Sequence, residues 1–193
     1  MPAVPLPVAA AWQHRDARQG FEVVYFRTAD DGYRIDGCTT AVEDGEPWVV
    51  EYAIHVDATW TTRGARVIAR WPAGTRRIEV EADGRGGWRV DGVPAPHLDG
   101  CLDLDLESSS MTNAFPVRRM ALGVGDKASA PAAYVRALDL SVERLEQEYV
   151  RVADDGVTQR YDYSAPVFEF SCRLVYDVAG LALDYPGIAV RAL

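Results

Sequence analysis

The sequence predicts an all-β fold in which one long, strongly coiled antiparallel sheet wraps around a single short helix. Three observations support this fold class: repeated hairpin signals, one very long alternating segment and one helix candidate. The dipeptide Asp-Gly supplies the positive backbone φ that tight hairpins require, and closely spaced hairpins indicate an antiparallel meander. It occurs seven times, at 31–32, 36–37, 44–45, 83–84, 91–92, 99–100 and 155–156.

The clearest strand of the predicted sheet runs from Trp48 to Trp60. Every second position is apolar: Trp48, Val50, Tyr52, Ile54, Val56, Ala58 and Trp60. At about 3.3 Å per residue such a strand would extend for roughly 43 Å, more than twice the usual length. Because a strand of that length has to bend within a chain of 193 residues, we expect a strongly curved sheet.

The best helix candidate is 114–122. Asn113 is the expected N-cap and Gly123 the expected C-cap. Phe115, Met120 and Leu122 are expected to pack against the apolar face of the sheet. Elsewhere strand patterns dominate, except that 134–149 fits either a helix or a strand; for this segment we expect strands that bend near residues 144–146.

Length and charge restrict the function. The 193 residues show no linker or low-complexity segment, so 1–193 is expected to form a single domain. A net charge of −9 argues against nucleic acid and against anionic membrane surfaces as partners. No apolar run reaches membrane-spanning length and no basic residue precedes the apolar N-terminal run, so we expect a cytoplasmic protein without stable membrane insertion. The three cysteines form no Cys-x-x-Cys pair and are expected to be reduced packing residues.

Candidate binding residues cluster around an acidic strand. Asp99, Asp103, Asp105 and Glu107 alternate with Leu102, Leu104 and Leu106, so the strand has an acidic face and an apolar face. The ligand spacing of a calcium loop is absent, which leaves a solvated charged face or ion pairs with Arg118 and Arg119. These two arginines could instead bind a phosphate or carboxylate headgroup, with Asn113 bonding to a sugar hydroxyl.

Aromatic residues near strand ends form a second group of candidates. Trp60 with Arg63, and Tyr185 beside Asp184, could serve as platforms at the mouth of a pocket or simply belong to the core. The three histidines share no metal-ligand spacing, and no nucleophile elbow or phosphate-binding loop is present. We therefore predict no catalytic residue, no metal and no cofactor.

Five ordered segments resemble the signature blocks of a bacterial glycolipid-binding family that was earlier catalogued as a domain of unknown function. They are DATWTTR (57–63), DGRGGW (83–88, followed by Asp91-Gly92), LDGCLDLDL (98–106), TNAFPVRR (112–119) and GLALDYPG (180–187). The resemblance implies a spiral β-roll, a long antiparallel sheet wound about one helix, and a homodimer. It also implies similarity to the half-barrels of lipoprotein carriers, on which the glycolipid assignment rests.

The leading functional hypothesis is non-enzymatic binding of an amphiphile, a glycolipid or related lipid, between the curved sheet and the helix. The expected ligand-binding residues are Trp60, Arg63, Asp103, Asn113, Arg118, Arg119 and Tyr185. Two alternatives remain: a small enzyme that uses the Asp103 and Asp105 carboxylates with Arg118 on a polar substrate, and a dimeric scaffold with a fully packed interior. An internal apolar cavity of roughly 300 Å³ or more would distinguish the binder from the scaffold.

Overall fold

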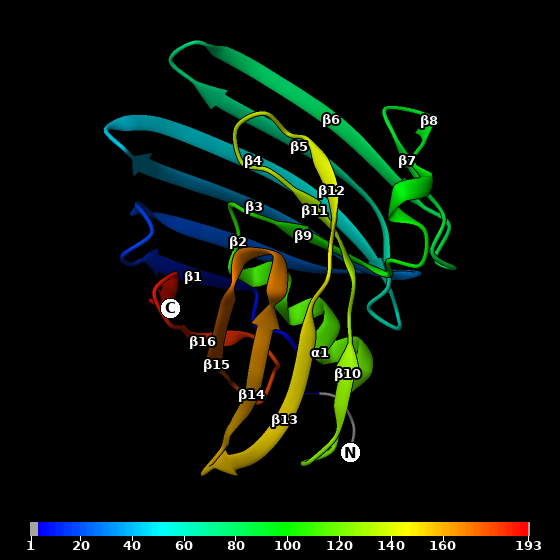
Figure 1. The fold of residues 1–193 in the computed structure, drawn as a ribbon, viewed down its shortest axis with the longest axis vertical. Helices are drawn as coiled ribbons and strands as arrows, with labels where there is room; N and C mark the ends of the chain where they lie inside the picture. The colour runs from blue at the N-terminus through cyan, green and yellow to red at the C-terminus, as the bar shows by residue number, and fades with distance from the viewer. Residues whose placement is uncertain (1–3, 193) are drawn as a thin grey trace.

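A computed structural model describes residues 4–192 and confirms the predicted all-β class. Its main feature is a 14-stranded sheet in which all neighbouring strands are antiparallel (Figure 1). The end strands β10 and β8 do not pair with each other, so the sheet is open. In pairing order the strands are β10 (Lys127–Ser129), β13 (Glu148–Asp155), β14 (Thr158–Ala165), β15 (Phe170–Tyr176), β16 (Ala182–Tyr185), β17 (Ala189–Arg191), β1 (Ala9–His14), β2 (Gln19–Ala29), β3 (Gly32–Glu43), β4 (Glu46–Asp57), β5 (Thr62–Trp71), β6 (Gly74–Ala82), β7 (Trp88–Val90) and β8 (Val93–Pro94).

A second, three-stranded sheet was not predicted. It consists of β12 (Val142–Leu145), β11 (Ala132–Val135) and β9 (Asp103–Leu106), and β11 pairs with β9 in parallel. The small sheet lies against the large one, because the Thr62 hydroxyl of β5 accepts a hydrogen bond from the backbone N–H of Leu104 at 2.9 Å. The ambiguous segment 134–149 forms parts of β11, β12 and β13, as expected for strands.

The short helix α1 (Ala114–Met120) lies between the long strands β1–β6 and the strands β13–β16 (Figure 1). Phe115 is fully buried with the aromatic residues of the N-terminal half, whereas Val117 belongs to a separate apolar cluster built from the C-terminal strands. The helix therefore fills the space between the two halves of the sheet, as predicted. The 3₁₀ helices are η1 (Pro96–Leu98), η2 (Met111–Asn113) and η3 (Pro166–Phe168).

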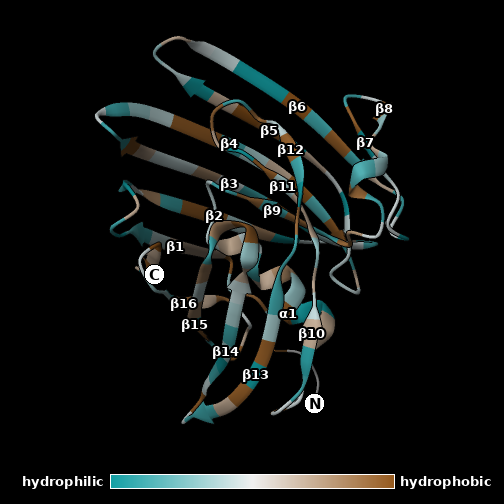
Figure 2. Ribbon diagram, in the orientation of Figure 1, coloured by the Kyte–Doolittle hydropathy of each residue, from teal (hydrophilic) through white to brown (hydrophobic). Residues whose placement is uncertain are grey.

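The long strands are curved and two-sided. Hydrophobic and hydrophilic bands alternate along them in Figure 2, as the period of the sequence requires. On β4 the alternation places Trp48, Val50, Tyr52, Ile54 and Val56 in the core. No helix among residues 4–192 combines the length and the apolar character needed to cross a membrane.

The predicted strand 48–60 is correct as far as Asp57 and wrong beyond it. Asp57 Oδ1 accepts hydrogen bonds from the backbone N–H groups of Thr59 and Thr61, at 2.8 and 3.1 Å, and these bonds close a turn. Trp60 lies in this turn, with a φ of 69°, and is nevertheless only 5% exposed. The apparent alternation at Trp60 thus comes from a buried turn residue and not from a continued strand.

Gly37 does not mark a turn, although it belongs to one of the seven Asp-Gly pairs. It lies inside β3, which continues to Glu43. A Cβ atom at this position would lie 2.1 Å from Cζ of Tyr52 on the neighbouring strand β4. Glycine is required here because a tyrosine ring packs directly on the backbone, not because the backbone reverses.

The predicted N-cap position of the helix is correct, but the capping hydrogen bond is absent and the predicted C-cap is wrong. Asn113 has the helical φ of −62° and its side chain makes no capping hydrogen bond. Instead, its Oδ1 accepts a hydrogen bond from the Tyr149 hydroxyl at 3.1 Å. The left-handed C-cap residue is Ala121, with a φ of 46°, so the helix ends before Gly123.

Candidate functional site

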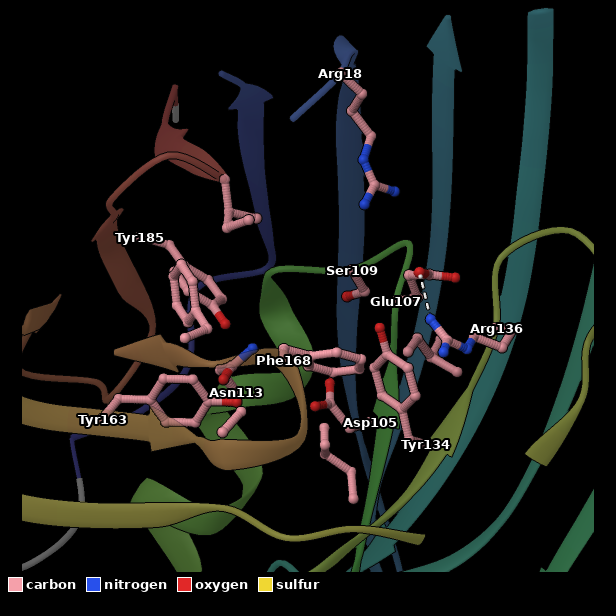
Figure 3. A pocket seen from close by; sticks show the side chains of 15 residues that line it. Arg18, Asp105, Glu107, Ser109, Asn113, Tyr134, Arg136, Tyr163, Phe168 and Tyr185 are labelled. Carbon is pink, nitrogen blue, oxygen red and sulfur yellow. Dashed lines mark hydrogen bonds and ion pairs between the residues drawn. The ribbon is translucent and has the colours of Figure 1, made fainter. Parts of the chain in front are cut away.

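A cavity of about 290 Å³ lies beside η2 and the small sheet, at the side of the C-terminal strands (Figure 3). Aromatic residues form most of one side, and a few polar groups reach it from β9 and the following segment. Its aromatic residues are Tyr134, Tyr163, Phe168, Phe170 and Tyr185. A concave apolar lining with few convergent polar groups is typical of small-ligand sites.

The aromatic side is continuous because its rings contact one another across neighbouring strands. Tyr163 of β14, Phe170 of β15 and Tyr185 of β16 form three contacts with ring centroids 6.1 to 6.3 Å apart. They pack at tilted or edge-to-face angles, which are favourable geometries for aromatic pairs. Such a surface offers apolar ring area to an acyl chain or to the C–H face of a sugar.

Asp105 is the central polar group. Its carboxylate accepts hydrogen bonds from Thr112 Oγ1 at 2.7 Å and from Gln147 Nε2 at 2.6 Å. Burial raises the pKa of Asp105 to about 6, while these two hydrogen bonds act in the opposite direction. Asn113 lies nearby, and its side-chain NH₂ group donates to no residue in the described range 4–192. The cavity therefore contains both acceptor and donor groups suited to hydroxyls.

An ion pair closes one edge of the cavity. Arg136 Nη1 lies 3.2 Å from Glu107 Oε1, and the backbone N–H of Ala137 donates to Glu107 Oε2 at 2.8 Å (Figure 3). The Arg136 guanidinium also lies over the rings of Tyr134 and Phe168, 5.4 and 5.5 Å from their centroids. Glu107 is consequently neutralised at this edge and is not a free charge.

Replacing Asp105 with asparagine should change how stability depends on pH. Because its pKa is about 6 in the folded protein and 3.8 as a free group, the folded state holds a proton that the unfolded chain releases. The free energy of unfolding should thus fall as pH rises from about 4 to about 6. Urea unfolding across this window should show a shallower fall for Asp105→Asn than for the wild type.

Two features of this prediction can be checked directly. Glu22 and Asp103 also have pKa values raised by burial, so Asp105→Asn should remove only part of the fall. Asp162, whose pKa is lowered by Arg173, is the matched control: Asp162→Asn should leave the fall above pH 4 unchanged. An equal slope in the wild type and Asp105→Asn would contradict the assignment.

The structure brings two of the predicted binding residues to the cavity. Asn113 and Tyr185 both line it (Figure 3). Trp60 lies elsewhere, in a stack with Tyr33 at 4.8 Å and with the Arg118 guanidinium 4.1 Å from its ring centre. Arg63 is half-exposed and lies 3.9 Å from the carboxylate of Asp57. Trp60, Arg118 and Arg63 thus lie outside the cavity lining, and their role in binding stays a prediction.

Asp103 and Arg119 form an ion pair with two hydrogen bonds. Arg119 Nε lies 2.9 Å from Asp103 Oδ1, and Nη2 lies 2.6 Å from Oδ2. Arg118 makes no such bond and donates instead to the backbone carbonyl of Ala179. Asp105 and the intervening Leu104 are buried as well, so β9 has no solvated acidic face. The sequence allowed either a solvated acidic face or ion pairs with the two arginines, and for Asp103 the structure shows the ion pair.

Sequence reasoning missed most of the cavity lining, including Arg18, Tyr134 and Tyr163. A signal existed for Tyr163, since Tyr161 and Tyr163 alternate along β14 and both point into the core. Tyr134 lies in the segment whose period was ambiguous. For Arg18, which lies between β1 and β2, nothing in the neighbouring residues distinguishes it from an exposed arginine.

Comparisons with known proteins agree with this fold. The chain is similar to a DUF1089 family protein from Pseudomonas aeruginosa, with a TM-score of 0.76 and 34% identity over 86% of this chain and 90% of that one. It also resembles a beta-barrel-like protein of the domain of unknown function DUF1849 from Brucella abortus, with a TM-score of 0.55 and 12% identity over 98% and 95% of the two chains. The second likeness concerns the fold alone.

No curated protein matches the chain. One family does, over residues 9–191, and its description is "Putative glycolipid-binding". The match includes all the signature-like blocks seen in the sequence, and the solved relative from Pseudomonas aeruginosa shares a third of its residues. The chain therefore belongs to the family described as "Putative glycolipid-binding".

Proposed function

We propose that this protein binds an amphiphile, a glycolipid or related lipid, without transforming it. The observation that carries the proposal is the cavity beside η2, which joins an aromatic wall to the polar groups of Asp105 and Asn113. An amphiphile has the same division into an apolar and a polar part. Membership of a family described as glycolipid-binding supports a binding role in general.

The size of the cavity limits what it can enclose. At about 290 Å³ it lies just below the usual range for small-ligand sites, roughly 300 to 1,000 Å³. A headgroup or one segment of an acyl chain would fit, and the remainder of a two-chain lipid would lie outside. A scaffold with a fully packed interior would lack this space.

The enzymatic alternative required Arg118 to act with Asp103 and Asp105. Asp103 is bonded to Arg119, Asp105 to Thr112 and Gln147, and Arg118 to the Ala179 carbonyl. No observation favours that alternative over binding. The predicted homodimer and cytoplasmic location remain part of the proposal, and sedimentation equilibrium tests the dimer.

The proposal is tested by titrating decyl glucoside, below its micelle concentration, into the protein in a calorimeter. Ala165 of β14 is buried and lines the cavity, so Ala165→Phe should fill it and weaken binding at least about tenfold. Ala153 of β13 is exposed, which makes Ala153→Phe the matched control, and its affinity should equal that of the wild type.

A second cavity-filling variant guards against misfolding of the first. Leu145→Phe enlarges a different lining residue, from β12, and should also weaken binding. Thermal unfolding shows whether each variant is folded. Failure of the wild type to bind both decyl glucoside and its acidic counterpart decyl phosphate, or unchanged affinity in a folded Ala165→Phe or Leu145→Phe variant, would refute the proposal.

A further inference from the structure

Arg18 is a buried charged residue that lines the cavity. Its side chain comes from the segment between β1 and β2 and points toward Ser109 and Glu107 (Figure 3). Only 9% of the residue is exposed. The guanidinium atoms Nε and Nη1 are buried and have no hydrogen-bond partner among residues 4–192.

The surroundings of Arg18 do not neutralise its charge. The contact that positions the guanidinium is an aromatic one, 5.2 Å from the ring centre of Trp48. Glu107, the acid toward which it points, is already held by Arg136 and by the N–H of Ala137. No salt bridge joins Arg18 to an acid within residues 4–192, in contrast to Arg136 on the other side of the cavity.

Of the other titratable groups around Arg18 at the cavity, His14 and Tyr134 carry no opposing charge and Asp105 is bonded to other residues. Burial, and next the charge of Arg18, lower the pKa of His14 to about 4, so this imidazole is neutral at pH 7. Burial raises the pKa of Asp105 to about 6, because the site stabilises a negative charge less well than water does, and this carboxylate is already bonded to Thr112 and Gln147. Burial also raises the pKa of Tyr134, which is therefore uncharged.

A buried guanidinium without a partner is unusual and costly. Folded proteins leave few buried polar groups unpaired, and an uncompensated buried charge is destabilising. The planar guanidinium offers donors in a fixed geometry that matches the oxygens of a carboxylate, phosphate or sulfate. An anionic group in the cavity would supply the partner that the chain lacks.

We propose that Arg18 binds a negatively charged group on the polar end of the ligand, namely a carboxylate, phosphate or sulfate ester. This inference rests on the proposed function and makes it more specific: the amphiphile is an acidic one. A cationic headgroup would meet both Arg18 and Arg136 at the cavity, and the faces of Tyr134 and Phe168 that could hold a cation already hold Arg136.

Calorimetric titration with three probes tests the inference: decyl phosphate, decyl glucoside and inorganic phosphate. The wild type should bind decyl phosphate at least about tenfold more tightly than decyl glucoside. Arg18→Met should lose this preference for decyl phosphate over decyl glucoside. Arg15→Met is the matched control, because Arg15 is exposed on the same segment, and it should behave as the wild type.

Thermal unfolding separates binding from a structural role. If Arg18 serves to bind a ligand, Arg18→Met removes an unpaired buried charge and should leave the unfolding temperature of the free protein equal or higher. Arg18→Lys keeps the charge without the planar donors and should show an intermediate preference for decyl phosphate. A lower unfolding temperature for Arg18→Met with an undiminished phosphate preference would overturn the inference.

The probes also separate this inference from the proposed function. If decyl glucoside binds the wild type and decyl phosphate binds no more tightly, the anionic headgroup is refuted and amphiphile binding stands. If inorganic phosphate binds as tightly as decyl phosphate while decyl glucoside does not bind, Arg18 holds a free anion and the amphiphile proposal fails. If none of the three binds, both are refuted.

Discussion

Replacing Arg119 with methionine should lower the free energy of unfolding by about 3 to 5 kcal/mol. Arg119 lies on α1, and its partner Asp103 on β9 has a side chain that is 1% exposed. The two hydrogen bonds between them satisfy a carboxylate that burial already makes unfavourable, as the raised pKa of Asp103 shows. Methionine keeps the apolar stem of the side chain and removes only the charge and its donors.

The loss should depend on pH in a defined direction. Without Arg119 the pKa of Asp103 rises further, because burial then acts without opposition. A protonated Asp103 has no charge to desolvate, so the difference between the wild type and Arg119→Met should be largest at neutral pH and shrink as pH falls. Urea unfolding at several pH values measures this difference.

Two further variants test whether the loss comes from the unpaired Asp103 carboxylate. Arg173 pairs with Asp162 through similar hydrogen bonds, but both side chains are about half exposed, so Arg173→Met should lower the free energy of unfolding far less than Arg119→Met. Combining Arg119→Met with Asp103→Leu removes both charges and should recover most of the loss. If the double variant is no more stable than Arg119→Met alone, the cost does not come from an unpaired carboxylate.

The acidic strand shows which kind of information the sequence contains. Alternation correctly places Leu104 in the core, because a strand has a period of two whatever it packs against. It could not reveal that β9 is covered on both faces and pairs in parallel with β11, about thirty residues later in the chain. For that reason Asp103 was predicted either to be solvated or to form an ion pair, and only the structure distinguishes these outcomes.

Short-range signals were ambiguous where one residue type can serve two purposes. Asp-Gly predicts turns through the positive φ of glycine, and this holds at Gly45 and Gly92. Gly37 belongs to the same Asp-Gly dipeptide but accommodates the Tyr52 ring. This is a long-range contact that no local pattern encodes. Asn113 was similarly predicted to cap α1, whereas its side chain bonds to Tyr149 from a distant strand.

The candidate site was the least predictable feature. It is assembled from segments far apart in the chain, so each residue taken alone resembles a core or surface residue. Asn113 and Tyr185 were identified from the chemistry of their side chains, an amide near two arginines and an aromatic ring near a strand end, and both line the cavity. Arg18 offers no such signal, and its importance appears only when burial and missing partners are known together.

Replacing Trp12 with alanine should lower the free energy of unfolding at least as much as replacing Arg119. The loss of the buried ring alone should cost about 3 to 5 kcal/mol. Trp12 is fully buried in β1, the strand at which the sheet passes from its C-terminal to its N-terminal strands. The β1–β17 pairing spans only three residue pairs, from Trp12 to His14. Trp12 Nε1 also donates to the Ala182 carbonyl of β16 at 2.7 Å, so the side chain links β1 to β16, the strand beyond its neighbour β17.

Trp12→Phe separates the two contributions. It retains an aromatic ring and removes the N–H donor, which leaves the buried Ala182 carbonyl without this bond and should cost about 1 to 3 kcal/mol. Trp71→Ala is the control, since Trp71 is only partly buried on β5 and should cost less than Trp12→Ala.

Hydrogen exchange locates the effect of Trp12. If Trp12 holds the two parts of the sheet together, the amides of β16 and β17 should lose protection in Trp12→Ala before those of β3 and β4, because the weakened junction can open locally. Uniform loss of protection throughout the sheet would show instead that Trp12 contributes to the core without any special role at the junction. Since the cavity residue Tyr185 is part of β16, such local opening should also weaken decyl glucoside binding at temperatures where the rest of the protein is still folded.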